Sequence, residues 1–311
     1  MTNRRIGVLI GGGTPERVTS LQSGEAVLRV LQAEGYSAQP IYVDREVDLA
    51  LRQAGIEVAF IALHGRGADG PIQGLLESLA IPYTGSSLAA AALTADRLKT
   101  KELLRLHNLP TPAYYCHQRS MGSAGDQHGA FGFPCLVRPR SGPGAMQVDR
   151  LEELELAIEH ALQWDDEALI ERHTEGQLIK VALLDGELLG IAEWRAEKLA
   201  APRIGEERLR GIATQAVRAH YLLGCSGLSL VDLVLSPHGN ESLVSIEPFP
   251  ELRPDSLIAR VAARAGIDFG DLIGQILDAA RLHSGRRLQE RREADVPWPG
   301  SDRRAAATES H

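Results

Sequence analysis

The sequence predicts a parallel α/β unit followed by two α+β units. In the first hundred residues, short apolar runs alternate with segments whose apolar residues recur at helical spacing. Such strand–helix–strand alternation is typical of a parallel sheet with helices on its faces. Two prolines then bracket a linker at residues 108–112, and strands predominate beyond it. We therefore divide the chain into residues 1–110, 111–195 and 196–283, with a tail over 284–311.

The N-terminal unit is expected to open with a buried strand at Ile6–Ile10, a glycine turn and a helix. The other elements expected there are strands at Pro40–Val43, Val58–Leu63 and Ile81–Thr84 and a helix at Leu75–Leu79. Ligands of such sheets bind beyond the C-terminal ends of the strands. The polar residues that follow Ile10 and Leu63 are therefore the first candidates for a site.

The second and third units are expected to mix strands and helices. In the second unit, residues 118–130 are poor in apolar groups and predict a loop. Its other elements are strands at Pro134–Arg138, Ala168–Arg172, Ile179–Leu184 and Leu188–Glu193 and a helix at Leu151–Leu162.

The third unit is expected to hold a helix at about Glu206–Leu223, strands at Gly227–Leu235 and Leu243–Glu247, and helices to about Leu282. The tail is rich in Arg, Glu, Pro and Ala and is predicted to be mostly disordered.

Composition narrows the class of protein. Apolar residues make up 44% of the chain and charged residues 24%, as in ordinary globular proteins. The net charge of −8 argues against non-specific nucleic-acid binding, which needs a basic surface. The three cysteines are far apart in sequence, so neither a disulfide framework nor a CxxC metal site is indicated. The run Ile6–Ile10 is too short for a signal peptide or a membrane span, and a cytoplasmic location is expected.

Polar residues follow the first and third predicted strands in dense blocks. The first block is Gly11–Arg17, followed by Ser20 and Ser23-Gly24. Glu16 in it is well placed to meet a ligand ammonium, although a carboxylate there can equally cap the helix that follows. The second block runs through His64–Gly70, Ile72–Glu77 and Ile81–Ser86, and a third comprises Asp96–Lys101.

These blocks resemble the D-alanine–D-alanine ligase family, whose motifs include H-G-x-x-G-E-D-G…Q-G…E…I-P-Y-T-G-S and M-D-K-x-x-T-K. The resemblance is dense over residues 5–115 and thinner afterwards. It implies an ATP-grasp fold with an N-terminal Rossmann-like domain. In the family, ATP and Mg²⁺ lie between two α+β lobes. One D-alanine carboxylate is phosphorylated, and the amine of a second D-alanine attacks the acyl phosphate.

The resemblance also implies roles for individual residues. Glu16 would anchor the amino group of the first D-alanine. The remaining candidates are Ser20, His64 and Lys198 for catalysis, Ser256 and Leu257 for substrate, Arg97, Arg138, Glu171 and Arg172 for nucleotide, and Asp232 and Glu247 for magnesium. A homodimer and partners in cell-wall synthesis are further expectations from the family.

Several positions depart from the family pattern. Arg97 and Arg138 stand where the family has lysines, and arginine keeps the charge but not the compact ammonium. Leu178 replaces the carboxylate that accepts the ribose hydroxyls. Leu230 replaces the arginine two residues before Asp232, which would stabilise the oxyanion.

Two connecting segments are also shortened or ambiguous. The phosphate loop, residues 140–146, is shorter than usual, and the lid expected between residues 193 and 205 has lost more than a dozen residues. Lys198 could replace the lid lysine, or it could belong to a solvated charged turn.

The segment 245–249 can be aligned with the family's metal-binding residues in two registers. In one, Glu247 takes the place of the magnesium glutamate and Phe249 that of an asparagine. In the other, Ser245 replaces the glutamate and Glu247 the asparagine.

Three functions are compatible with these residues. The chain could be an active D-alanine–D-alanine ligase with a remodelled nucleotide site. It could be a catalytically inactive relative that acts as a binding or scaffold partner in peptidoglycan precursor synthesis, and the combined losses in the ATP half favour this interpretation over the first. It could also be a ligase for a different amino acid or hydroxy acid.

Overall fold

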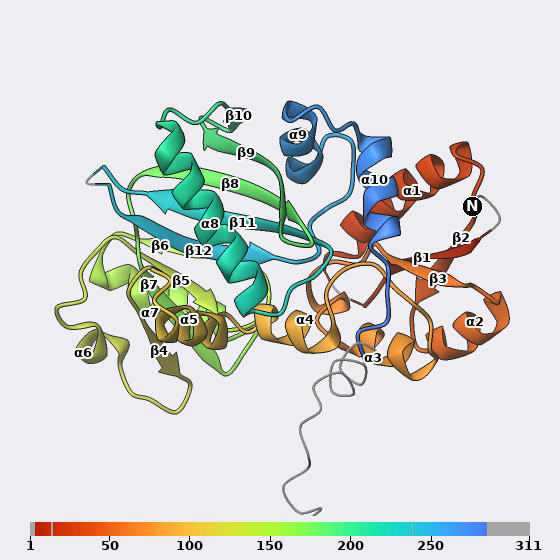
Figure 1. Cartoon of the computed structure of the whole chain (residues 1–311). Coiled ribbons are helices and arrows are strands. Elements are labelled where there is room, and N and C mark those ends of the chain that lie inside the picture. The colour runs from red at the N-terminus through yellow and green to blue at the C-terminus, as the bar shows by residue number, and fades with distance from the viewer. Residues whose placement is uncertain (1–3, 14, 238, 285–311) are drawn as a thin grey trace, which may run out of the picture.

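The computed structural model describes residues 4–13, 15–237 and 239–284. The tail predicted to be disordered lies outside these residues, apart from Ser284. Within the described chain the strands form three sheets, which lie in separate parts of the molecule (Figure 1). In the same part of the chain, no helix is long and apolar enough to cross a membrane.

The N-terminal sheet is parallel, as predicted. Its strands are β1 (Arg5–Gly11), β2 (Ser37–Val43) and β3 (Val58–Ile61), in the order β2-β1-β3. The helices that accompany them are α1 (Arg17–Ala33), α2 (Val47–Ala54), α3 (Pro71–Ser78) and α4 (Leu88–Ala95), with a short 3₁₀ turn η1 at Gly65–Gly67. The strand expected at Ile81–Thr84 is wrong: only Tyr83 forms a bridge, to Ala59 on β3. The N–H and C=O of Tyr83 bond Arg281, on a segment remote in sequence, while the neighbouring Pro82 and Thr84 bond Ala59.

The second sheet is antiparallel and belongs to a small lobe. Its strands are β4 (Tyr114–Gln118), β5 (Cys135–Pro139), β6 (Met146–Val148) and β7 (Glu167–Arg172), in the order β4-β7-β5-β6. The helices before and within this part are α5 (Arg97–Leu106), α6 (Ala124–His128) and α7 (Leu151–Ala161).

Helix α6 lies where a loop was predicted. Glu155 on α7 accepts hydrogen bonds from the Ser123 hydroxyl and the Ala124 N–H. The first turn of α6 is therefore held by a tertiary partner, which the local composition does not reveal.

The third sheet, also antiparallel, contains β8 (Gln177–Leu184), β9 (Glu187–Arg195), β10 (Lys198–Ala200), β11 (Leu228–Leu235) and β12 (Glu241–Glu247), in the order β10-β9-β8-β11-β12. Because β8 and β9 pair within this sheet, the change of sheet falls between Arg172 and Gln177. The boundary expected at residue 195 does not coincide with it. Helix α8 (Glu206–Leu222) packs on one face of the sheet through a core that includes Ile179, Val231 and Ile212.

Two C-terminal helices join the first and third sheets. Helices α9 (Leu257–Arg264) and α10 (Phe269–Asp278) lie between the five-stranded sheet and α1 (Figure 1). One continuous core contains Ile6 and Val27 from the N-terminal unit, Ile258 and Ile273 from these helices, and Leu230 from β11. This shared core fixes the N-terminal sheet against the five-stranded sheet, so the loops at their edges face each other at constant separation.

The close approach of α1 to β1 predicts a matched pair of glycine variants. A Cβ at Gly24 on α1 would lie 1.9 Å from Cγ2 of Ile10, so Gly24→Ala should destabilise the protein by about 1–3 kcal/mol through overpacking. Gly211 on α8 is exposed and has no heavy atom within 4 Å of an added Cβ. Gly211→Ala should therefore stabilise by about 0.5–1 kcal/mol. Urea unfolding of both variants measures these changes, and equal stabilities would contradict the packing.

Candidate active site

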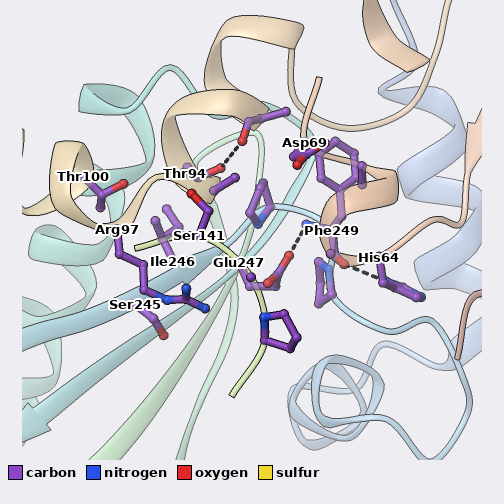
Figure 2. A pocket seen from close by; sticks show the side chains of 18 of the residues that line it. His64, Asp69, Thr94, Arg97, Thr100, Ser141, Ser245, Ile246, Glu247 and Phe249 are labelled. Carbon is purple, nitrogen blue, oxygen red and sulfur yellow. Dashed lines mark hydrogen bonds between the residues drawn. The ribbon is translucent and has the colours of Figure 1, made fainter. Parts of the chain in front are cut away.

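A cavity of about 480 Å³ lies where the three sheets meet. Its walls come from all three units, and Figure 2 shows His64 and Phe249 on one side of it, Arg97 and Ser245 on the other, and Glu247 between them. The candidates from the sequence that line it are Glu16, His64, Arg97, Arg138, Glu171 and Glu247. The folding of the chain thus brings together six residues spread over more than two hundred positions.

Glu16 lies between β1 and α1, and one oxygen of its carboxylate has no hydrogen-bond partner among the described residues. The carboxylate packs against Gly65, where an added Cβ would lie 2.7 Å from Glu16 Cδ. The side chain makes no capping hydrogen bond to α1. Its Oε2 atom is buried and has no hydrogen-bond partner in the described chain. A buried carboxylate oxygen without a donor is costly, and a ligand ammonium would satisfy it.

His64 follows β3 and uses both ring nitrogens. Nδ1 lies 2.9 Å from the Phe249 carbonyl oxygen, and Nε2 lies 2.9 Å from the Ser23 hydroxyl. A carbonyl only accepts, so Nδ1 carries the proton and Nε2 accepts from Ser23. Burial lowers the pKa of His64, which keeps this neutral tautomer at pH 7. His64 therefore positions the chain around Phe249 and has no ring nitrogen free for proton transfer.

Cationic side chains gather at the opposite side, near the small lobe. Glu171 on β7 is buried and pairs with Lys101 Nζ at 2.5 Å and with Arg138 Nε at 2.8 Å. Arg97 donates to the Pro139 carbonyl at 3.0 Å and forms no ion pair with a carboxylate of the described chain. Burial and the neighbouring Arg138 cation lower the pKa of Arg97. Cations placed this close together, with a single buried carboxylate between two of them, favour an anionic ligand.

Glu247 and Asp232, the two candidates for metal, face the same side of the five-stranded sheet. Asp232 lies opposite Ser245, and Glu247 lies opposite Leu230. Glu247 Oε1 accepts the Phe249 N–H at 3.1 Å. Burial raises the pKa of Glu247, and the nearby Asp232 and Glu16 carboxylates add to this effect. Both Ser245 and Glu247 line the cavity, whereas Asp232 does not.

The residues present do not suit the metal that the family implies. Asp232 Oδ2 lies 2.7 Å from the Lys180 ammonium, so a cation already neutralises that carboxylate. Within the described residues there is no group of three or more His, Cys, Asp or Glu side chains that could hold a metal ion. Phe249, two residues after Glu247, has an apolar side chain and cannot serve as a ligand.

Five other candidates lie outside the cavity lining. The hydroxyl of Ser20 donates to the Ala62 carbonyl and accepts the Gly11 N–H, so it joins β1 to the chain after β3. Ser256 caps α9, and Leu257 packs on the core shared by the first and third sheets. Lys198 is exposed on β10, and the Arg172 side chain donates to the Phe131 carbonyl.

Two lysines that the motifs did not assign carry charge near the site. Lys101 is 3% exposed and pairs with Glu171, and Lys180 is 8% exposed and pairs with Asp232. A lysine within an apolar strand, as in Leu178-Ile179-Lys180-Val181-Ala182, is a usable signal because a lone buried ammonium must have a partner. The identity of that partner depends on the sheet register.

The buried ion pairs of Glu171 predict a large effect on stability. Glu171→Gln would leave Lys101 and Arg138 without their carboxylate and should cost about 3–5 kcal/mol. The matched variant Glu102→Gln breaks only an exposed pair with Lys99 and should cost about 1 kcal/mol or less. Denaturant unfolding of both variants measures the difference, and similar losses would show that burial does not govern the Glu171 pairs.

Comparison with known proteins agrees with this geometry. The family described as D-ala D-ala ligase C-terminus matches residues 105–201 and 195–278. The chain is 37% identical over 302 residues to the D-alanine–D-alanine ligase of Anaeromyxobacter sp. (strain K), covering 90% of this chain and 98% of that protein. For the ligase of Geobacter sulfurreducens, the identity is 37% over 299 residues, covering 89% and 94%.

Solved structures show the same fold. The D-alanine–D-alanine ligase of Bacillus anthracis complexed with ATP superposes with a TM-score of 0.83 at 28% identity, covering 92% of this chain and 99% of that one. The ligase of Coxiella burnetii gives a TM-score of 0.80 at 20% identity, covering 94% and 97%, which supports the fold alone. The expected ATP-grasp fold with a Rossmann-like N-terminal domain is thereby confirmed. The chain belongs to the D-alanine–D-alanine ligase family.

Proposed function

We propose that this chain is an ATP-dependent carboxylate–amine ligase that takes D-alanine as its first substrate. The observation that carries the proposal is that opposite charges lie at the two sides of the cavity. At one side Glu16 presents a buried carboxylate oxygen that has no partner among the described residues, and the cations Arg97 and Arg138 lie at the other. An amino acid bound by its ammonium at Glu16 would direct its carboxylate away from Glu16, toward those cations.

The cation side of the cavity fits the phosphates of ATP. Arg97 and Arg138 both line it, and planar guanidinium groups bind phosphate oxygens in pairs. Ser141 and Gly142 of the short loop after β5 line the cavity beside them. ATP, when bound, supplies the phosphoryl group that activates a carboxylate. The ribose would find no carboxylate at Leu178, so the nucleotide would be held chiefly by its phosphates.

The residues of the chain contribute to the reaction by orientation and by charge. Glu16 holds the first amino acid by its ammonium, and His64 keeps the Phe249 segment in place beside it. Fixed cations in a low-dielectric cavity stabilise negative charge that develops in the transition state. Leu230 lacks the guanidinium of the family's oxyanion arginine, and loss of such a donor slows a reaction by about 10²–10³. We therefore expect slow turnover.

The role of Glu16 predicts a specific binding defect. Glu16→Gln should weaken D-alanine binding by about tenfold or more, because hydrogen bonds to charged groups contribute roughly 1.5–3 kcal/mol. Glu25→Gln, on the exposed face of the same helix, removes an equal charge and should leave binding unchanged. Calorimetry with D-alanine, followed by phosphate release with ATP, tests the pair. Unchanged D-alanine affinity in Glu16→Gln would rule out the proposed ammonium site.

The role of Arg97 predicts a defect on the nucleotide side. Arg97→Gln should weaken ADP binding by about tenfold or more, because a charge-assisted contact to phosphate is lost. Arg105→Gln lies on the same helix but is exposed over the Tyr114 ring, and should bind ADP as the unchanged protein does. Calorimetric titration with ADP measures both affinities. Equal affinities in the two variants would place the phosphates elsewhere.

A second candidate function is a non-catalytic binding protein of cell-wall synthesis. Leu178 and Leu230 favour it, because apolar residues stand at two polar positions of the family. In that case D-alanine could still bind at Glu16, but ATP would release no phosphate in its presence. The same assay with other amino acids and hydroxy acids distinguishes a different substrate from inactivity. The homodimer and cell-wall partners remain predictions from the family, and the cytoplasmic location remains a prediction from the sequence. Magnesium, which the family implies, does not suit the residues at Asp232.

A further inference from the structure

A single charged pair crosses the apolar centre of the five-stranded sheet. Lys180 on β8 and Asp232 on β11 are directly opposed in the register, and their charged atoms lie 2.7 Å apart. The next residues on the same face of these two strands are Leu178, Ala182, Leu230 and Val234. On the following strand, Ser245 lies opposite Asp232 and lines the cavity. The pair therefore lies on the sheet face that carries the cavity wall, one strand away from it.

Neither member of the pair is saturated by its partner. Lys180 is 8% exposed, and its ammonium has one hydrogen-bond acceptor, Asp232 Oδ2, among the described residues. The other oxygen, Asp232 Oδ1, is buried and has no hydrogen-bond partner in the part of the chain that the structure describes. A buried ammonium offers three N–H donors, so two remain for another group. Unused donors and acceptors at such depth indicate that a polar ligand completes the cluster.

A divalent cation at Asp232 would compete with the Lys180 ammonium. Metal ions of this class are held by carboxylate oxygens that other cations do not already neutralise. The nearest carboxylate on the same sheet face is Glu247, two residues along β12 from Ser245, and it already accepts the Phe249 N–H. The positive charge beside Asp232 is therefore supplied by the Lys180 side chain and not by a bound metal ion.

We propose that the Lys180 ammonium is a built-in cation that takes the place of a divalent metal ion at Asp232 and donates its remaining N–H groups to an oligophosphate bound over this face of the sheet. The ligand class follows from charge: an ammonium with unused N–H groups suits an anion, and Arg97 and Arg138 line the cavity whose wall includes the adjacent Ser245. Oligophosphate binding then requires no metal at Asp232. The cation at Asp232 can be tested without D-alanine and without turnover, so the result is independent of the proposed ligase function.

Manganese binding tests the first half of the proposal. Electron paramagnetic resonance measures free Mn²⁺ in titrations of the full chain without nucleotide. The unchanged protein should bind Mn²⁺ no better than Asp232→Asn does. Lys180→Met keeps an unbranched side chain, one atom shorter, and removes the charge. Asp232 and Glu247 then become available, and Mn²⁺ affinity should rise by about tenfold or more. The double variant Lys180→Met/Asp232→Asn should lose that gain.

The matched control is Lys99→Met, which removes the same charge from an exposed lysine paired with Glu102. It should leave Mn²⁺ affinity unchanged. Tighter Mn²⁺ binding by the unchanged protein than by Asp232→Asn would overturn the proposal, and this comparison holds even if Lys180→Met fails to fold. A folded Lys180→Met protein with no gain in affinity would overturn it as well.

Inorganic tripolyphosphate with EDTA present tests the second half. The unchanged protein should bind it in calorimetry, Lys180→Met should bind at least about tenfold more weakly, and Lys99→Met should bind as the unchanged protein does. Equal affinities of the unchanged protein and Lys180→Met would exclude Lys180 as a phosphate donor. Loss of D-alanine turnover alone would bear on the ligase function and leave these results standing.

Discussion

The hydrogen bond between His64 Nδ1 and the Phe249 carbonyl is the contact on which the site depends. It joins the end of β3 to the chain that leaves β12, and Ser23 closes the arrangement by donating to His64 Nε2 and accepting the Leu252 N–H. These bonds hold the segment after Glu247 against α1. Glu16, which precedes α1, and Glu247, at the end of β12, therefore face one cavity.

Within the described chain, charged side chains around the cavity lack partners that a bound ligand would supply. Among the described residues, one carboxylate oxygen of Glu16 has no donor, and on the other side Arg97 forms no ion pair with a carboxylate. In between, burial raises the pKa of Glu247, and the neighbouring carboxylates oppose its ionisation further. A zwitterionic ligand together with an oligophosphate would compensate both ends at once. The stability lost in leaving these groups incomplete is recovered on binding, which is how binding sites differ from structural ion pairs.

Sequence patterns predicted the elements whose causes are local. The apolar run, glycine turn and helical spacing at residues 5–33 correspond to β1 and α1, and the motif blocks pointed to Glu16, His64 and Arg97, which all line the cavity. Predictions went wrong where the cause is remote. The first turn of α6 depends on Glu155, and at residues 81–84 only Tyr83 forms bridges, to Ala59 and to the remote Arg281.

A side chain that a motif assigns to the site can instead form its hydrogen bonds with the backbone. Ser20 and Ser256 belong to matching segments, but the first bonds the backbone around β1 and the second caps α9. No spacing rule separates a serine that meets a ligand from one that satisfies an amide. Lys180 illustrates the converse, because its partner Asp232 is 52 residues away and only the β8–β11 register brings the two together.

The departures from the family pattern form a set that is physically consistent. Leu230, at the place of the oxyanion arginine, is 8% exposed and packs in the core shared by the first and third sheets. Lys180 neutralises the carboxylate of Asp232, which would otherwise be left buried and unbalanced. A buried carboxylate without a cation costs several kcal/mol, roughly the margin of stability of a domain. Leu230 thus packs where a polar group of the family has been lost, and Lys180 balances a carboxylate that has been kept.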